Sequence, residues 1–322
     1  MTVKLINPST GLPLKKVKDE LRDNSGASFP IINGIPRFAP VDNYAESFGM
    51  QWNKFAATQL DRQMSGMTLS RDRFFTTTGW NPDELAGLDI LEVGSGAGRF
   101  SEVVLSNTRA KLWSVDYSTA VDANLRNNGA IAPDRFFLFQ SSVYEMPFPD
   151  ETFDKAFCLG VLQHTPNFSE SVRSIIRKVK IGGEIVVDFY PITGFWTKLH
   201  AKYLLRPATK RLPKTTLLRL IERTATPLGK FARGLRSAGL GIMTRFVPVA
   251  DDRGFPCDLS PEEYREWLVL DTFDWYSPEF DQPQRVATVR RMFEEHGAEV
   301  TFAGMLPGPG SAGAIVRGIR RR

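Results

Sequence analysis

The chain has 322 residues and a formal net charge of +5, and this length can bury a sizeable core with room for about a hundred residues beyond one domain. It has no N-terminal hydrophobic signal run and no stretch near the roughly 20 apolar residues of a membrane span, so we expect a soluble cytoplasmic protein. The two cysteines, Cys158 and Cys257, have no partners at metal-ligand spacing, which argues against a disulfide framework and a cysteine metal site.

The first elements along the chain are an apolar cluster and a helix. The cluster lies within residues 1–40 and comprises Phe29, Ile31, Ile32, Ile35 and Phe38. Apolar residues follow at helical spacing, so residues 44–55 are expected to form a helix. Aromatic side chains at this spacing are most often part of a core, and the alternative is that Tyr44 or Trp52 faces a ligand. Residues 71–75 form a further helical segment before the turn at Asn81 and Pro82.

Residues 89–100 are the most informative segment, a buried strand followed by a glycine-rich turn and a helix. Gly94, Gly96 and Gly98 let the backbone approach a ligand without an intervening Cβ. The spacing differs from the G-x-G-x-x-G of dinucleotide sites, because Arg99 stands where the third glycine would be. Glu92, just before the turn, would repel a pyrophosphate and suits an ammonium group. The segment therefore predicts a site for a nucleoside-like ligand without phosphates.

A second strand, residues 111–116, ends in Asp116 about 20 residues beyond the glycines, where a carboxylate can accept both hydroxyls of a ribose. With these two motifs the chain resembles the class I S-adenosylmethionine-dependent methyltransferases. Residues 140–148, 152–166 and 179–189 resemble further segments of that family, in the expected order. The resemblance implies S-adenosylmethionine as the cofactor and methyl transfer as the reaction.

The same resemblance assigns cofactor contacts to individual residues. These are Glu92, Gly94, Gly96, Gly98, Asp116, Ser142, Val143 and Leu159. Ser142 stands where the family often has an acid for the adenine amino group, and Val143 supplies a backbone N–H. From the preceding helix, Arg73 is our candidate for binding the cofactor carboxylate, and a solvated helix face is the alternative.

Alternating strands and helices predict a doubly wound α/β fold with a parallel sheet and right-handed crossovers. We expect strands at 88–93, 111–115, 135–139, 153–159, 183–190, 300–303 and 314–319, and helices at 98–106, 119–127, 169–179 and 285–297. The resemblance implies a seven-stranded Rossmann-like sheet with an antiparallel last strand, which follows a turn at residues 307–313. We assign residues 41–191 and 284–322 to this core, and residues 192–283 to a helical insertion that forms a substrate lid.

Residues 1–40 resemble a small zinc-ribbon module that some bacterial methyltransferases carry and that also exists as a separate activator protein. In that module two Cys-x-x-Cys pairs hold the metal. The matching positions here are Asn7, Thr10, Arg22 and Ser25, which do not make a zinc ligand set. We therefore expect a degenerate, metal-free ribbon, with an irregular N-terminal cap as the alternative.

The insertion is strongly basic in its first part. Residues 192–248 contain 12 Lys or Arg residues and a single acid, Glu222, interleaved with leucines as in amphipathic helices. Three interpretations remain open: a solvated face over a helical lid, a site for an anionic substrate such as a prenyl phosphate or a nucleotide-linked sugar, or contact with a membrane or a nucleic acid. No recognised nucleic-acid motif is present, so we expect no nucleic-acid partner, whereas peripheral lipid contact stays open.

The second part of the insertion carries aromatic and acidic residues after a helix start at Ser260 and Pro261. The residues that we expect to face the substrate lie either in this lid or in the helix at 44–55. They are Tyr44, Trp52, His200, Arg206, Asp271, Asp274, Trp275 and Tyr276. The alternative is that the aromatic residues only anchor the lid on the core.

Methyl transfer requires a nucleophile held in line with the activated methyl group, and a base helps if the acceptor is a hydroxyl or an amine. His164, in the loop after the fourth strand, is our first candidate for that base, and Tyr190, at the end of the fifth, is the second. The leading hypothesis is a methyltransferase for a small molecule, anionic or lipid-like. The alternative is a binding or regulatory protein that keeps the fold without catalysis. The sequence specifies neither the acceptor atom nor the oligomeric state.

Overall fold

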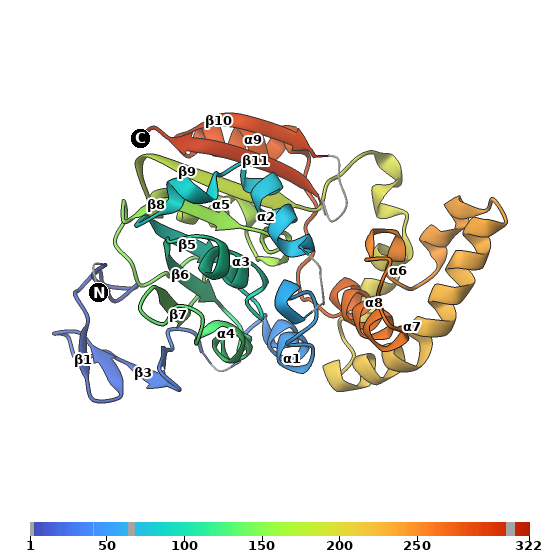
Figure 1. Cartoon of the computed structure of the whole chain (residues 1–322), viewed down its shortest axis with the longest axis horizontal. Helices are drawn as coiled ribbons and strands as arrows, with labels where there is room; N and C mark the ends of the chain where they lie inside the picture. The colour runs from blue at the N-terminus through green and yellow to red at the C-terminus, as the bar shows by residue number, and fades with distance from the viewer. Residues whose placement is uncertain (1–2, 41, 64–67, 307–312) are drawn as a thin grey trace.

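The central element of the fold is a seven-stranded sheet, shown in the computed structural model, which describes residues 3–40, 42–63, 68–306 and 313–322 (Figure 1). Its strands are β5 (Asp89–Val93), β6 (Lys111–Asp116), β7 (Phe136–Gln140), β8 (Phe153–Cys158), β9 (Val179–Phe189), β10 (Ala298–Met305) and β11 (Ala314–Arg320). Their order is β10-β11-β9-β8-β5-β6-β7. The five strands from β7 to β9 run parallel, whereas β11 is antiparallel to both of its neighbours.

Helices cover both faces of this sheet. The helices on one face are α2 (Leu69–Thr78), α3 (Arg99–Asn107) and α4 (Val121–Asn128). The helices on the other face are α5 (Phe168–Lys178) and α9 (Val286–Glu295). Each face has its own apolar cluster, with Ile90 and Leu112 on the first and Leu91 and Val187 on the second. The doubly wound α/β fold with an antiparallel last strand, expected from the sequence, is confirmed.

The elements form where local sequence signals agree with burial. The apolar runs of β5 and β6 are buried on both faces, as strands between two helical layers require. The side chain of Asn167 caps α5 by accepting a hydrogen bond from the N–H of Glu170. Most observed bounds lie within two residues of the expected ones, but β9 begins at Val179 instead of 183. The turn expected at 307–313 lies outside the described residues except for residue 313.

The insertion between β9 and α9 forms a helical body at one end of the molecule, beyond the carboxyl ends of the parallel strands (Figure 1). Its elements are η4 (Phe195–Lys198), α6 (Ala201–Thr209), α7 (Lys214–Ser237), η5 (Gly241–Phe246), η6 (Asp252–Gly254) and α8 (Pro261–Tyr276). A separate apolar cluster holds them together, with Leu217 and Ile221 of α7 packed against Leu268 and Phe273 of α8. The insertion therefore has a core of its own. Within the described ranges, none of the helices is long and apolar enough to cross a membrane.

Helix α1 (Glu46–Lys54) connects the insertion to the sheet, since it contacts both α4 and α8. Three short 3-10 turns complete the core: η1 (Asp61–Gln63), η2 (Pro82–Leu85) and η3 (Leu162–His164). Lys54 at the end of α1 forms an ion pair with Glu222 of α7 at 2.5 Å. This contact uses the only acid of residues 192–248.

The N-terminal residues form a small antiparallel sheet at the opposite end of the molecule from α7 (Figure 1). Its strands are β1 (Lys15–Val17), β2 (Glu20–Arg22), β3 (Ser28–Ile32) and β4 (Ile35–Pro36). The sheet docks beside β7, where the N–H of Phe38 donates to the Gln140 carbonyl at 2.7 Å. Arg37 adds a 2.6 Å ion pair to Asp122 of α4. The N-terminal sheet is therefore attached to the core edge farthest from the antiparallel strands.

A polar cluster joins two turns of this small sheet. The Asn7 side-chain amide donates to Asp23 Oδ2 at 2.6 Å, and Asp23 Oδ1 accepts from the N–H and hydroxyl of Ser25. These hydrogen bonds, with that from Ser25 the largest cause, lower the pKa of Asp23 to about 2. Of the four positions compared with zinc ligands, Asn7 and Ser25 lie in this cluster, while Thr10 and Arg22 are exposed. The described residues contain no group of three or more His, Cys, Asp or Glu that could hold a metal ion.

Candidate functional site

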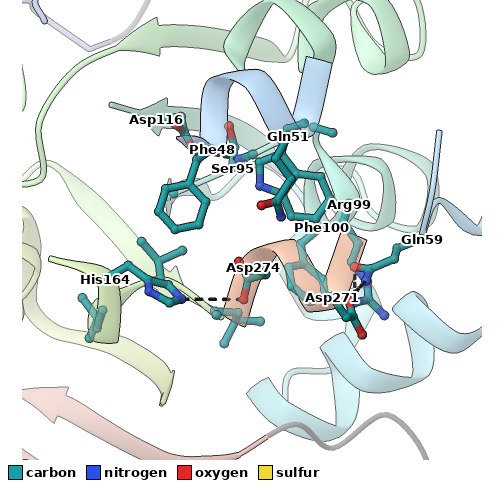
Figure 2. A pocket seen from close by; sticks show the side chains of 18 of the residues that line it. Phe48, Gln51, Gln59, Ser95, Arg99, Phe100, Asp116, His164, Asp271 and Asp274 are labelled. Carbon is teal, nitrogen blue, oxygen red and sulfur yellow. Dashed lines mark hydrogen bonds and ion pairs between the residues drawn. The ribbon is translucent and has the colours of Figure 1, made fainter. Parts of the chain in front are cut away.

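A cavity of about 830 Å³ lies at the carboxyl edge of the parallel strands, between the glycine-rich turn, α1 and α8 (Figure 2). This volume is within the range of small-molecule sites. After β5 the next strand, β6, is added on one side of β5, whereas β8 and then β9 are added on its other side. The carboxyl ends of β5 and β8 therefore lie at the point where the strand order reverses, and ligands bind there in open α/β sheets. Figure 2 shows Asp116 and Ser95 at one end of the cavity and His164 and Asp274 at the other.

The glycine-rich turn and Asp116 form the first end. Gly94 and Gly96 line the cavity with φ angles of 79° and 52°, a region that L side chains rarely adopt. A Cβ at Gly94 would lie 2.3 Å from a methyl carbon of Val161, so only glycine fits there. Asp116 Oδ2 accepts from the N–H of Gly96 at 2.8 Å, and Oδ1 accepts from the N–H and hydroxyl of Ser118. The carboxylate is thus fixed against the turn by backbone donors.

Gly98 has a different role from the two glycines before it. It is not among the residues that line the cavity. Its φ of 92° begins α3, and a Cβ there would lie 2.1 Å from Asn128 Nδ2 and 2.2 Å from Asn124 Oδ1. Gly98 therefore allows α4 to pack closely on the start of α3. The expectation of a cofactor contact at Gly98 is replaced by this packing role.

Glu92 also lies away from the cavity, contrary to the expectation that its carboxylate faces an ammonium group. The side chain is 2% exposed, and its Oε2 accepts from the hydroxyls of Ser101 and Ser114, both at 2.5 Å. Burial raises the pKa of Glu92 to about 7, although these two hydrogen bonds act in the opposite direction. The carboxylate therefore connects β5, β6 and α3 behind the turn.

The wall next to Asp116 contains Ser141, Val143 and Leu159. Val143 and Leu159 were expected to contact the cofactor, and both line the cavity. Ser142 is not in the lining: its hydroxyl accepts from the N–H of Tyr144 at 3.2 Å. The neighbouring Ser141 lines the cavity instead, so the serine assignment differs by one residue.

Two arginines enter the cavity from α2 and α3. Arg73 Nη2 donates to Asp188 Oδ2 at 2.8 Å, and its buried Nε has no hydrogen-bond partner. Arg99 donates to the Ser70 hydroxyl and to Gln59, each at 2.9 Å. Burial, and then the nearby charge of Arg73, lowers the pKa of Arg99 to about 9. The two guanidinium groups therefore lie on this side of the cavity together with the carboxylates of Asp188 and Asp271, and Arg99 was not among the candidates from the sequence.

His164 of η3 forms the opposite end. Its Nδ1 lies 3.0 Å from the carbonyl oxygen of Phe280, which can only accept, so the Nδ1 atom carries the proton of the neutral ring. The buried Nε2 then keeps a lone pair, and it has no hydrogen-bond partner. Burial lowers the pKa of His164, although Asp274 and Asp281 act against this effect. His164 is therefore a neutral acceptor near pH 7, as a general base must be.

One carboxylate of α8, that of Asp274, faces this histidine, whereas Asp271 lies beside Gln59 and Arg99 (Figure 2). Asp274 Oδ2 lies 3.9 Å from His164 Nε2 and accepts from the Tyr190 hydroxyl at 3.1 Å (Figure 2 shows the first contact). Burial, and then the charge of Asp274, raises the pKa of Tyr190 well above its usual value. Tyr190 therefore acts as a hydrogen-bond donor to Asp274, which makes it a poor candidate for the base. Burial raises the pKa of Asp271, one turn before Asp274, to about 7.

Aromatic residues of α1 and of the segment just before it cover the cavity. The ring of Phe48 lies 5.0 Å from that of His164, between centroids, and Tyr44 lies 4.9 Å from Tyr117. Trp52 lies over the glycine-rich turn, since its Nε1 would be 3.3 Å from a Cβ at Gly96. Tyr44 and Trp52 thus line the cavity as expected, but Trp52 lies at the end that contains Asp116.

Three residues expected on the substrate side lie outside this cavity. His200 caps α6 through a bond from the N–H of Lys202 and lies in a shallow side pocket of about 320 Å³ with Trp275. Arg206 is buried and donates to the carbonyls of Trp275 and Pro278. Tyr276 is 3% exposed and belongs to the core of the insertion. Asp274 and Trp275 do line the cavity. Helical spacing explains the difference, because Tyr276 points away from the face that carries Asp271, Asp274 and Trp275.

Comparison with known proteins finds a methyltransferase domain. A family model described as a methyltransferase domain matches residues 91–187, from β5 into β9. The ubiquinone biosynthesis O-methyltransferase of Pseudomonas fluorescens (strain SBW25) is 29% identical over 139 residues, which cover 41% of this chain and 56% of that protein. The one of Pseudomonas entomophila (strain L48) is 30% identical with the same coverage. The chain thus spans about half the length of the curated relatives it matches.

Solved structures with a similar arrangement include two methyltransferases. A SAM-dependent methyltransferase from Aquifex aeolicus aligns with 12% identity and a TM-score of 0.45, over 80% of this chain and 95% of that chain. Magnesium protoporphyrin IX methyltransferase from Synechocystis PCC 6803, with bound SAH, aligns with 14% identity and a TM-score of 0.46, over 86% and 96%.

The family match implies S-adenosylmethionine as the cofactor, and the cavity residues fit it. Asp116 lines the cavity with a carboxylate that could accept from ribose hydroxyls, and the turn at Gly94 and Gly96 has no Cβ at the surface. Besides Arg73 Nε and His164 Nε2, two further buried polar atoms of lining residues have no hydrogen-bond partner, Ser95 Oγ and Gln51 Oε1. A hydroxyl can donate to the cofactor's carboxylate and an amide oxygen can accept from its ammonium group. Gln51 was not among the candidates from the sequence, because the apolar spacing around it predicts a helix but nothing in that pattern indicates a binding role.

Proposed function

We propose that this chain transfers the methyl group of S-adenosylmethionine to a small-molecule acceptor that is anionic or lipid-like. The observation that carries the proposal is the unpartnered Nε2 of His164, buried in the same cavity as Asp116. The aromatic lining, with Phe48, Trp267 and Trp275, supports an acceptor with an apolar body. Arg73 and Arg99 support a negative charge on one of the bound molecules.

The cofactor supplies an activated methyl group, so the protein's part is to position the acceptor and move a proton. His164 Nε2 accepts the proton of the acceptor hydroxyl or amine. The resulting imidazolium is stabilised by Asp274, whose carboxylate is held by Tyr190. General-base catalysis of this kind contributes about 10²- to 10⁴-fold. Phe48 and Trp52 cover the site and exclude water from it.

Calorimetric titration with S-adenosylmethionine and S-adenosylhomocysteine tests the cofactor assignment. We expect saturable binding of both in the micromolar to sub-millimolar range and none of NAD. Absence of binding contradicts the proposal. A binding protein without catalysis would bind both molecules. It would form no S-adenosylhomocysteine from S-adenosylmethionine when an extract that contains acceptor molecules is added. That second outcome would favour the regulatory alternative.

We also propose that residues 1–40 are a zinc-ribbon-like module in which hydrogen bonds replace the metal. The support is the bond between Asn7 and Asp23, which links the two turns. Elemental analysis of the purified chain should find no stoichiometric zinc, and Asp23→Ala should lower the midpoint of thermal unfolding. Bound zinc at one equivalent would contradict this assignment. The expected cytoplasmic location and the expected domain bounds stay predictions.

A further inference from the structure

The charges of the insertion are distributed unevenly over its surface. Several of the 12 basic side chains of residues 192–248 have partners: Lys202 pairs with Asp281 at 2.6 Å, Lys210 with Glu279 at 3.2 Å, and Arg236 with Asp252. The basic residues for which the described part of the chain offers no ion pair or side-chain hydrogen bond are Lys198, Arg211, Arg219, Arg223 and Lys230. The unbalanced charge is thus concentrated mainly on α7.

These cations share one side of α7. Arg219, Arg223 and Lys230 are exposed and follow one another at intervals of four and seven residues, which places them within about 40° of each other around the helix. The buried side of α7, with Leu217 and Ile221, faces α8. The basic stripe therefore points outward.

An apolar stripe runs beside the basic one. Leu220 and Phe231 are 51% and 57% exposed, and with the exposed Pro227 they also lie within about 40° around the helix. The stripe of these three residues is offset from the cations by about 80°. An exposed stripe of this kind next to cations is typical of helices that lie in a membrane interface.

The segment after α7 extends the apolar surface. Turn η5 packs against α7 and exposes Leu240, Ile242, Met243 and Phe246, with Ile242 at 73% the most exposed large apolar side chain of the described residues. Scattered exposed leucines are ordinary in proteins, but a contiguous group of this size marks an interaction site. We call the α7 stripes and η5 together the outer face of the insertion.

The opposite side of α7 reaches the wall of the cavity. Arg236, in the last turn of α7, forms ion pairs with Asp251 and Asp252, and Asp251 lines the cavity together with Arg253 and Phe255. Helix α7 therefore lies between the outer face and this side of the site.

We propose that the outer face of the insertion binds the surface of an anionic lipid bilayer. Aliphatic side chains such as Leu220 and Ile242 enter the headgroup region, and the cations on α7 contact the acidic lipids. Nucleic acid fits the cations but not the exposed aliphatic group, and a protein partner is an outcome of the test below. This proposal goes beyond methyl transfer and does not depend on it.

Sedimentation of the full chain with lipid vesicles tests the proposal. We expect binding to phosphatidylcholine vesicles that contain phosphatidylserine, weak binding to phosphatidylcholine alone, and release by added salt. The variant Arg219→Glu/Arg223→Glu/Lys230→Glu should bind the anionic vesicles at least about tenfold more weakly, because each cation near such a surface contributes roughly a factor of five.

A matched control carries the same change in net charge at the other end of the molecule. It is Lys4→Glu/Lys15→Glu/Lys16→Glu, three exposed positions in the N-terminal segment. We expect it to bind vesicles within about twofold of the unmodified chain, because its charges lie beyond the Debye length of the outer face. Equal loss in both triple variants would overturn the proposal, since binding would then follow net charge alone.

A second variant tests the apolar part without changing charge. Ile242→Ser/Phe231→Ser alters exposed side chains only, so it should fold normally while losing about tenfold in vesicle affinity. Three results contradict the proposal: no binding of the unmodified chain to anionic vesicles, displacement of bound vesicles by duplex DNA, or a dimer in sedimentation velocity that this variant disperses.

Discussion

The two ends of the cavity are built in different ways. At the cofactor end, Gly94, Gly96 and Asp116 lie close together in the sequence, and backbone N–H groups hold the carboxylate. At the acceptor end, His164, Tyr190 and Asp274 come from η3, the residue after β9, and α8, and the partner of the histidine Nδ1 lies 116 residues away. The first end is local and uses the backbone, whereas the second depends on how a long insertion folds back. A motif can therefore reveal the first end but not the second.

The largest effect that separates the two ends should come from His164→Asn. The asparagine amide can still donate to the Phe280 carbonyl, but the basic Nε2 is lost. We expect methyl transfer to fall by about 10²- to 10⁴-fold with cofactor affinity unchanged. Transfer of a labelled methyl group and calorimetry measure the two quantities. Full activity in this variant would remove His164 from the reaction.

The pH profile of methyl transfer adds a second readout for the same residue. Burial lowers the pKa of His164, so the neutral ring persists below the ordinary value of 6.5. We therefore expect the acid limb of the profile to have its midpoint below pH 6.5, and to be absent in the asparagine variant. A limb that survives the substitution would belong to another group.

Asp116→Ala should act on the cofactor end alone. The loss of two charge-assisted hydrogen bonds to ribose hydroxyls should weaken cofactor binding by roughly 10²- to 10⁴-fold. Asp116→Asn, which keeps one acceptor oxygen, should lose less. Calorimetry with S-adenosylhomocysteine measures both variants. Unchanged affinity would mean that the ribose does not bind at Asp116, and the contrast between the two ends would fail.

Gly98→Ala should destabilise the fold without touching the cavity. The added Cβ would meet Asn128 Nδ2 at 2.1 Å in addition to the strain of a positive φ, so we expect a loss of roughly 3 kcal/mol in the free energy of unfolding. The matched control is Gly87→Ala, where φ is 77° and no atom lies within 4 Å, with a loss of about 1 kcal/mol. Urea unfolding compares the two, and equal losses would refute the packing role.

Asp271→Asn should have the smallest effect and concerns the wall of the cavity beside Gln59 and Arg99. Burial raises the folded-state pKa of Asp271 to about 7, whereas the unfolded carboxyl titrates near 3.8. The folded state thus binds the extra proton, so stability falls as pH rises between these values. The free energy of unfolding of the variant should therefore change less with pH, by roughly 2 to 3 kcal/mol between pH 5 and 8. The measurement is urea unfolding of both proteins at pH 5 and pH 8. Because Glu92 titrates in both proteins, its contribution cancels when the free energy of unfolding of one is subtracted from that of the other.

Much of the fold could be predicted from the sequence because its signals are local. Apolar strands, the Asn167 cap and the glycine turn are set by neighbouring residues, and the strand bounds followed closely. The same motifs led to Val143 and Asp116, which both line the cavity. Glu92 and Ser142 were misplaced because a motif gives a residue's position along the chain but not the direction of its side chain, which Ser101 and Tyr144 determine.

The acceptor end was predicted only in part. Asp274 and His164 were identified as candidates, but their proximity depends on the register of α8 against η3, which no local pattern encodes. Arg206 was expected to bind substrate because it is a cation in the lid. Its partners are carbonyl groups about 70 residues away, so its role became visible only in three dimensions.

A crystal structure with S-adenosylhomocysteine tests the central claim most directly, namely that one cavity holds the cofactor at Asp116 and the acceptor at His164. We predict that the ribose hydroxyls bind Asp116 and that the sulfur points toward the space between Phe48, His164 and Asp274. A ribose away from Asp116, or a sulfur directed away from His164, would contradict the account.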